Sequence, residues 1–338
     1  PHVSWLKPST TKPLRVLYLT SNRSLREIVE LDERFDFERD VFTTVSQRDL
    51  SSNDSRVQQM LPGISPGDML TRLHLKLETN YDVISVGNIY WQTLPNWGRK
   101  RILDKVAAGA GLVLFVRGPW PEDLHPILSS SIALDGREVL SAFPHAGLPA
   151  YRGHATFEQF VGRTLLFARH GEGRVVLIRG RAPEGASSSL WASHGVGEGI
   201  EVPDRQMLTP VVVDAFPNLN LIHYDYYLAQ VGHLMRWAGN SPRPVRVVQP
   251  TLALTVGQRE HWQPLALTIQ SDAQRKIALV ATLRHAELGN VLQQAETQVM
   301  LAAGFNRPQV QLDTPPAGHY FLDLWVKQND AVLDYGSL

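Results

Sequence analysis

Short apolar runs alternate with amphipathic stretches through the N-terminal part of the chain. Residues 15–20 (RVLYLT), 37–45, 81–87 (YDVISVG) and 111–118 (GLVLFVRG) have the length and composition of strands. Between them apolar residues recur at helical spacing, as at Met69, Leu73 and Leu77. Parallel strands need such helical crossovers, which cover both faces of the sheet. The pattern predicts a doubly wound, mainly parallel α/β sheet.

Capping signals indicate where the helices begin and end. Residues 24–27 (SLRE) have the S-x-x-E form of a capping box, and they predict a helix that carries Ile28 and Leu31. Residues 65–68 (SPGD) supply an N-cap, a first-turn proline and an acidic residue for the next helix. A third helix is expected from about residue 95, and it ends at Gly109.

The rest of this region combines a long excursion, a hairpin and a closing helix. Residues 119–160 are rich in Pro, Ser and Gly, which predicts an excursion of weak regular structure. Segments 164–169 and 174–179 flank Gly171-Glu172-Gly173 and predict a β-hairpin. Apolar residues at helical spacing predict a last helix that ends before the linker GNSP at 239–242; they are Tyr227, Val231, Leu234 and Ala238.

From about Pro244 onward the pattern changes to period-two alternation. Two such runs are Ile277, Leu279, Ala281, Leu283 and Tyr320, Leu322, Leu324, Val326. Runs of this kind between Gly, Pro, Asn and Asp turns predict an antiparallel sandwich of immunoglobulin or fibronectin type III size. We therefore expect an N-terminal extension (1–13), an α/β domain (14–241) and a β-sandwich domain (242–338).

Composition excludes several classes of function. The 338 residues include 33 Lys and Arg against 33 Asp and Glu, so no positive field favours a nucleic-acid partner. No apolar run reaches about 18 residues, so we expect no membrane insertion of this chain. The N-terminus lacks the features of a signal peptide, but it starts at Pro1, and we expect an upstream segment. An extracytoplasmic bacterial location is favoured, although the compartment stays open.

The order of these segments resembles the class I glutamine amidotransferase-like superfamily, which is flavodoxin-like. The resemblance spans about residues 14–240 and depends on YDVISVG, GLVLFVRG, GEGRVVLIRG and YDYYLAQVGHLMRWAG in that order. It extends in particular to branches without amidotransferase activity, which are modules of large bacterial proteins and the trimerisation domain of some β-galactosidases. The resemblance implies a role in oligomerisation, and an association with carbohydrate-processing or envelope proteins.

The nucleophile of that family is missing. Active members carry a cysteine in a G-x-C-x-G turn after the strand that corresponds to 111–118, and a His-x-Glu pair further on. Here Val116 or Arg117 takes that place, and the chain contains no cysteine. Losing a triad nucleophile costs on the order of a millionfold in turnover, so we expect a degenerate active site without glutaminase activity. His285-Ala286-Glu287 is read as a solvated strand end of the β domain.

Other groups of residues leave open a hydrolase that uses no cysteine, and they give no indication of a metal or nucleotide site. Ser188 and Ser189 with His194 and Glu198 have the residue types of a hydrolase that uses no cysteine, but a flexible surface loop is the favoured explanation for them. Histidines 145, 154, 170 and 194 are widely spaced, which indicates no metal site, and the glycine runs lack the pattern of a nucleotide-binding loop, so no cofactor is expected.

The best pocket candidates follow the carboxyl ends of predicted parallel strands, where open α/β sheets bind ligands. They are Arg117, Trp91 and Trp120, and the two indoles suit stacking on a sugar in a carbohydrate-binding module. The leading hypothesis is a non-catalytic module for assembly or ligand positioning in a larger bacterial protein. Its partners would be a second copy of the chain, other domains of that protein or a carbohydrate.

Overall fold

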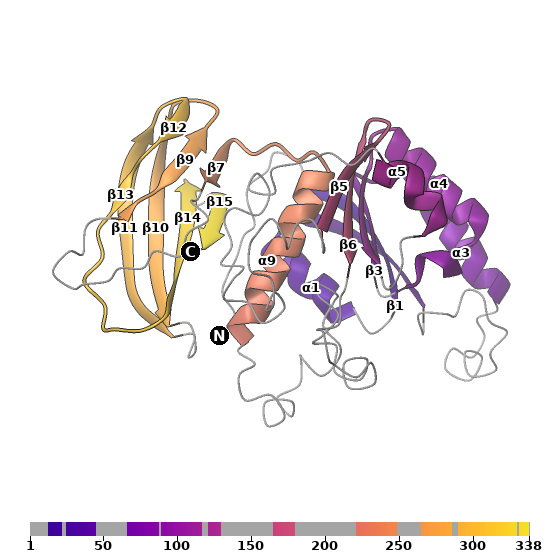
Figure 1. Ribbon diagram of the computed structural model, residues 1–338, viewed down its shortest axis with the longest axis horizontal. Coiled ribbons are helices and arrows are strands. Elements are labelled where there is room, and N and C mark those ends of the chain that lie inside the picture. The colour runs from indigo at the N-terminus through magenta and orange to yellow at the C-terminus, as the bar shows by residue number, and fades with distance from the viewer. Residues whose placement is uncertain are drawn as a thin grey trace, which may run out of the picture.

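The structure is a computed structural model of the chain. It describes residues 13–21, 25–44, 66–87, 89–116, 121–129, 165–179, 221–248, 265–285, 290–329 and 331–337. These residues form a layered α/β part and an antiparallel β part that lie side by side, with α9 (Leu221–Ala238) on the side of the sheet that faces the β part (Figure 1). The predicted fold class, a doubly wound parallel sheet followed by an all-β sandwich, is confirmed.

The α/β part is built on a six-stranded sheet with the order β2-β1-β3-β4-β6-β5. Five strands run parallel, and β5 pairs antiparallel with β6 at one edge. The strands are β1 (Leu14–Ser21), β2 (Phe37–Thr44), β3 (Val83–Gly87), β4 (Gly111–Val116), β5 (Leu165–His170) and β6 (Gly173–Arg179). All four predicted parallel strands and the predicted hairpin are present.

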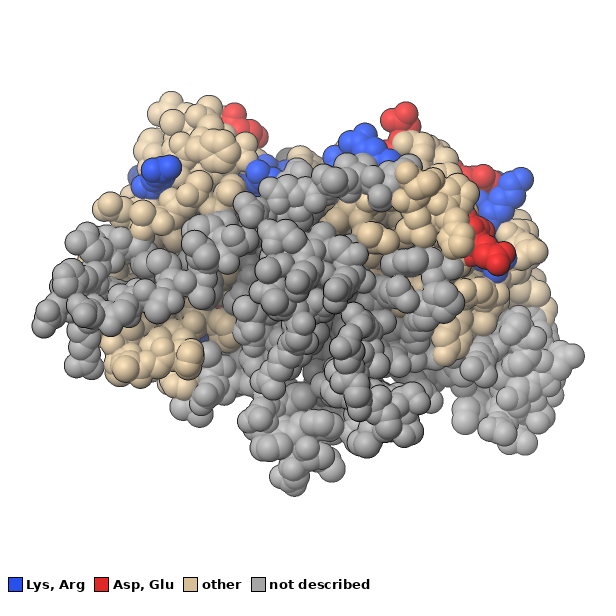
Figure 2. All heavy atoms as spheres, in the orientation of Figure 1, with Lys and Arg blue, Asp and Glu red and all other residues tan. Residues whose placement is uncertain are grey.

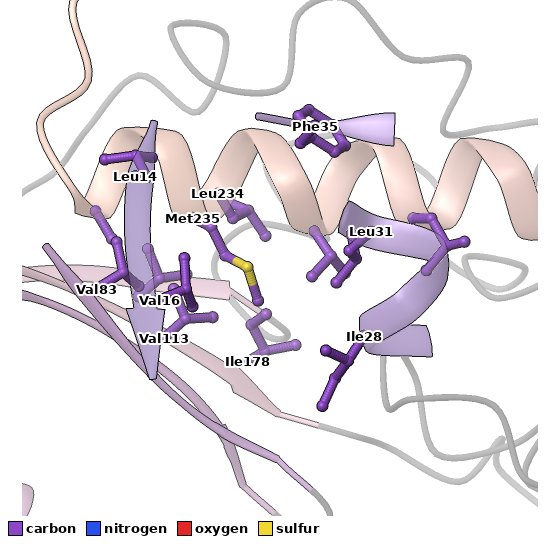
Figure 3. Packing of buried hydrophobic residues seen from close by; sticks show 14 of the residues in the cluster. Leu14, Val16, Ile28, Leu31, Phe35, Val83, Val113, Ile178, Leu234 and Met235 are labelled. Carbon is purple, nitrogen blue, oxygen red and sulfur yellow. The ribbon is translucent and has the colours of Figure 1, made fainter. Parts of the chain in front are cut away.

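Helices cover both faces of this sheet because neighbouring residues of each strand point to opposite sides. On one side α1 (Leu25–Arg34) and α9 pack on residues such as Val16 and Val113. Figure 3 shows Leu234 and Met235 of α9 directed toward these strand residues. On the other side α3 (Pro66–Glu78), α4 (Asn96–Ala107) and the short α5 (His125–Ser129) pack on the alternate residues of the same strands.

Where the capping residues are among the described residues, the helices end at the positions that the sequence predicts. Pro95 lies at the N-cap position of α4, and Gly109 follows its last turn with φ 117°, a conformation that favours glycine. The hairpin turn packs closely on this helix end, since a Cβ on Gly173 would lie 2.1 Å from the Val106 carbonyl oxygen. Ser24, the predicted capping residue of α1, lies outside the described residues.

The β part contains three sheets of antiparallel strands. Their orders are β11-β10-β14-β15, β12-β9-β7 and β13-β8. The strands are β7 (Val245–Val248), β8 (Leu265–Ala266), β9 (Thr268–Ser271), β10 (Arg275–His285), β11 (Val291–Leu301), β12 (Gly304–Asn306), β13 (Gln309–Val310), β14 (Tyr320–Gln328) and β15 (Ala331–Ser337). The predicted domain boundary at 241/242 falls between α9 and β7.

The apolar residues predicted from period-two alternation form the core of the sandwich. Leu279 and Leu324 are fully buried there; Leu279 of β10 pairs with Val326 of β14, and Ala281 of β10 pairs with Leu324 of β14. The remaining predicted members, except the partly buried Tyr320, are also buried in this cluster. The alternation therefore marks the inner face of the sandwich, as expected for an antiparallel sheet.

The opposite face of the same sheet is also buried. Val280, Phe321, Trp325 and Tyr335 belong to the apolar cluster that contains the residues of β1, α1 and α9. The two parts of the molecule therefore share one core. The period-two alternation in the sequence is equally typical of a sheet whose second face is exposed to solvent. The contact of this second face with the α/β part was therefore not predicted.

The described surface is mixed in charge. Figure 2 shows Lys and Arg interspersed with Asp and Glu on the face in view, rather than gathered into one basic area. Among the helices of the described residues, none combines the length and the apolar character needed to cross a membrane.

Candidate functional site

The carboxyl edge of the parallel sheet is the position where this architecture places a ligand. The chain leaves β1 for β2 on one side and later reaches β3 on the other, so the strand order reverses between β1 and β3. Crevices form outside the carboxyl ends of strands at such a reversal. Ser21, Gly87 and Val116 are the last residues of β1, β3 and β4 at this edge.

Small hydroxyl side chains line the strands near this edge. Thr20 of β1 pairs with Gly87 of β3 and with Thr43 of β2, and Thr44 is buried next to it along β2. In the described part of the chain the buried Thr20 hydroxyl has no hydrogen-bond partner. The edge therefore offers polar contacts but, among these residues, no acid or base that could activate a hydroxyl.

Trp91, one of the three predicted pocket residues, is enclosed rather than open at this edge. It begins the short 3₁₀ turn η2 (Trp91–Thr93) after β3 and is only 3% exposed. Its indole N–H donates to both carboxylate oxygens of Asp123, at 3.0 Å each, from the turn η3 (Glu122–Leu124). The Nε of Arg99 lies 2.9 Å from the same carboxylate. These three residues join α4 to the two turns that follow β3 and β4.

Replacing Asp123 by alanine is expected to lower the free energy of unfolding by about 1–3 kcal/mol, because the buried Trp91 N–H loses its acceptor. Asp104→Ala is the matched control, since Asp104 is an exposed aspartate of α4, and its loss should change stability by no more than about 0.5 kcal/mol. Urea unfolding followed by tryptophan fluorescence measures both. Equal effects of the two substitutions would contradict a structural role for this contact.

The other predicted site residues lie outside the described residues. Arg117 and Trp120, the partners of Trp91 in the predicted pocket, are among them. So are the residues of the hydrolase alternative, which are Ser188, Ser189, His194 and Glu198. A pocket or a serine site formed by these residues therefore stays a prediction. In the part of the chain that is described, no group of three or more His, Asp or Glu could hold a metal ion.

In the two His-x-Glu sequences of the chain, neither His170 nor His285 is close to Val116. His170-Gly171-Glu172, which sequence reasoning passed over, forms the β5–β6 turn, and Glu172 N–H donates to the Ala107 carbonyl at 3.0 Å. Because β6 runs parallel to β4, this turn lies at the amino edge of the sheet, opposite Val116. His285 ends β10 in the sandwich and is half-buried against Tyr320, while Glu287 lies outside the described residues.

A buried polar cluster lies where the two parts of the molecule meet. Asp334 of β15 is fully buried, and it accepts a hydrogen bond from Arg243 Nη2 at 2.9 Å and another from Val247 N–H at 2.7 Å. Arg243 Nη2 also lies 3.3 Å from Nδ1 of His233 in α9. A guanidinium can only donate, so Nδ1 accepts and the ring proton of a neutral His233 is on Nε2.

Burial lowers the pKa values of two side chains in this cluster, His233 and Arg236. Burial lowers the pKa of His233 well below its ordinary value, and the positive charges of Arg243 and Arg236 lower it further. The ring is therefore neutral at pH 7. Burial and the charge of Arg243 lower the pKa of Arg236 to about 10, against the opposite pull of Asp334, so this guanidinium stays protonated.

Sequence reasoning missed this cluster, because its members come from α9, the linker and the last strand. Arg243 and Asp334 are 91 positions apart. One signal was present: Asp334 and Asp323 interrupt otherwise apolar strands, and a charged residue inside a buried strand requires a partner. Asp323 is likewise fully buried, and it accepts from Arg284, Tyr335 and Ser337.

Comparison with known proteins adds little. No family model matches the chain, and no curated protein matches it. One match among solved structures is "The structure of a beta-glucuronidase from glycoside hydrolase family 2", with 14% identity, a TM-score of 0.19, and coverage of 30% of this chain and 11% of that one. The match thus spans a small part of that enzyme, and a similarity of this size is too low to relate the two folds.

Proposed function

We propose that the chain is a non-catalytic module of the class I amidotransferase-like type, joined to an immunoglobulin-like sandwich, which serves assembly or ligand positioning within a larger bacterial protein. The supporting observation is Val116. Val116 is one of the two residues, with Arg117, that the resemblance puts in the place of the family's nucleophile; it is 4% exposed and packs in the core with the residues of α3 and α4. A buried aliphatic side chain has no atom that could attack a carbonyl carbon.

The position of the described His-x-Glu at the β5–β6 turn supports the same proposal. A triad needs its nucleophile and base within hydrogen-bond reach, about 2.6–3.2 Å. Val116 ends β4 at the carboxyl edge, whereas His170 ends β5 at the amino edge, so the length of the sheet separates them. The described residues of this part therefore support a scaffold rather than an acyl-transfer enzyme.

A role in assembly is supported by the shared core and by apolar side chains at the surface. The α/β part and the sandwich share one apolar core, and two domains joined in this way suit a spacer between other domains. Met300 and Phe305, on β11 and β12 of the sandwich, are 59% and 69% exposed. Exposed large apolar side chains of this kind are common contacts between protein surfaces.

We expect no release of ammonia from glutamine by the purified chain above the rate of a buffer blank. Val116→Cys is the matched variant. It introduces a thiol at one of the two candidate nucleophile positions, and it should remain inactive because the described residues place no base beside it. Ammonia production by either protein would contradict the non-catalytic proposal.

The assembly role has a separate test, since sedimentation velocity should show self-association that Phe305→Ala weakens.

A further inference from the structure

We propose that the junction between α9 and the sandwich is a binding site for a small oxyanion, a phosphate or carboxylate group, with Arg236 as its principal ligand. The proposal does not depend on the proposed function, because a module or an enzyme could equally carry such a site. It starts from one side chain whose polar atoms are buried and unused.

Arg236 lies in the last turn of α9 and is 2% exposed. Within the described part of the chain, none of its three guanidinium nitrogens has a hydrogen-bond partner. A guanidinium carries five N–H donors, and leaving them unpaired in a buried place costs several kcal/mol when no other group compensates. Buried arginines are therefore nearly always paired, and this one indicates a missing acceptor.

The neighbouring acceptors accept hydrogen bonds from other groups, and none of them bonds to Arg236. The carbonyl oxygens of residues 235, 236 and 237, which would otherwise be free at the helix end, accept from the N–H groups of Gly239, Ser241 and Asn240. Trp237 O also accepts from Arg174. Each oxygen of Asp334 already accepts a short hydrogen bond, one from Arg243 and one from Val247.

The charges of the cluster do not balance. Arg236 and Arg243 are positive, Asp334 is negative and His233 is neutral, so these four buried or partly buried groups carry one excess positive charge. Charges in such an environment are normally paired. One anion would restore neutrality and supply the acceptors that Arg236 lacks.

The chemistry of the donors selects the class of anion. The planar guanidinium fork matches two oxygens of a phosphate or carboxylate in a bidentate geometry. A spherical halide would not use the two parallel donors of the fork.

The test uses the whole chain in an oxyanion-free buffer, with inorganic phosphate and acetate as separate probes. We expect Tm to rise with the logarithm of the phosphate or acetate concentration once it exceeds Kd, by about 4 °C at about one hundred times Kd. Isothermal titration calorimetry with the same probes should give one site per chain. The probe with the lower Kd distinguishes a phosphate from a carboxylate ligand.

Two variants make the result specific. Arg236→Met removes the unbalanced charge while keeping an apolar stem, so it should melt at or above the wild-type temperature without oxyanion and gain nothing from phosphate or acetate. Arg246→Gln is the matched control, because Arg246 is a half-buried arginine of the sandwich bonded to Gln270 at 2.9 Å, and it should respond like the wild type.

Three outcomes would overturn the proposal. One is a wild-type chain that responds to neither probe. Another is an Arg236→Met variant that responds as strongly as the wild type, since binding would then be elsewhere. The third is an equal response to sodium chloride at matched ionic strength, which would show that the site does not select an oxyanion.

Discussion

Replacing Asp334 by asparagine is expected to lower the free energy of unfolding by about 3–5 kcal/mol, the range found when one partner of a buried ion pair is removed. The carboxylate is fully buried, and it is the acceptor for both Arg243 and the Val247 N–H. Asparagine has nearly the same shape, but its amide carries no charge and presents N–H donors toward the arginine. Arg243 would be left without its counter-charge beside Arg236.

Asp272→Asn is the matched control for this substitution. Asp272 pairs with Arg275 at 2.7 Å, but its side chain is 57% exposed, so solvent screens the pair and its loss should cost no more than about 1 kcal/mol. Guanidinium unfolding monitored by circular dichroism compares the two variants. A loss for Asp334→Asn as small as that for Asp272→Asn would show that this junction is open to water.

Replacing Trp325 by alanine is expected to cost about 3–5 kcal/mol, because it removes a large side chain from the core shared by the two parts of the molecule. Trp325 is 8% exposed and packs on Tyr335 with 5.3 Å between ring centroids. It lies on the face of β14 opposite the sandwich core. The cost therefore measures the docking of the sandwich on the α/β part.

Phe305→Ala provides the comparison on the same sandwich. Phe305 is 69% exposed, so this substitution should change the free energy of unfolding by about 0.5 kcal/mol or less. The two variants can be compared by urea unfolding with far-ultraviolet circular dichroism. If Trp325→Ala were as mild as Phe305→Ala, the outer face of β14 would be in contact with solvent and the two cores would be separate.

The candidate site was predicted less well than the fold. The sequence correctly placed Trp91 just beyond the carboxyl end of a parallel strand, but its exposure could not be predicted. That property depends on Asp123, which reaches the indole from a turn 32 positions further along the chain. Arg236 and Asp334 were not recognised, since the position of Asp334 in an apolar strand indicates only that it needs a partner, and nothing in the sequence places it beside Arg236.

The sequence by itself determined the α/β strands and helices, the hairpin, the closing helix and the inner face of the sandwich. These follow from local periodicity, in which a period of two or of about 3.6 marks the side of an element that is buried. Only the tertiary structure decided that β10 and β14 are buried on both faces and that charged residues from α9, the linker and β15 meet between the two parts. A periodic pattern reports that a face is buried, but the identity of its partner depends on how distant segments pack together.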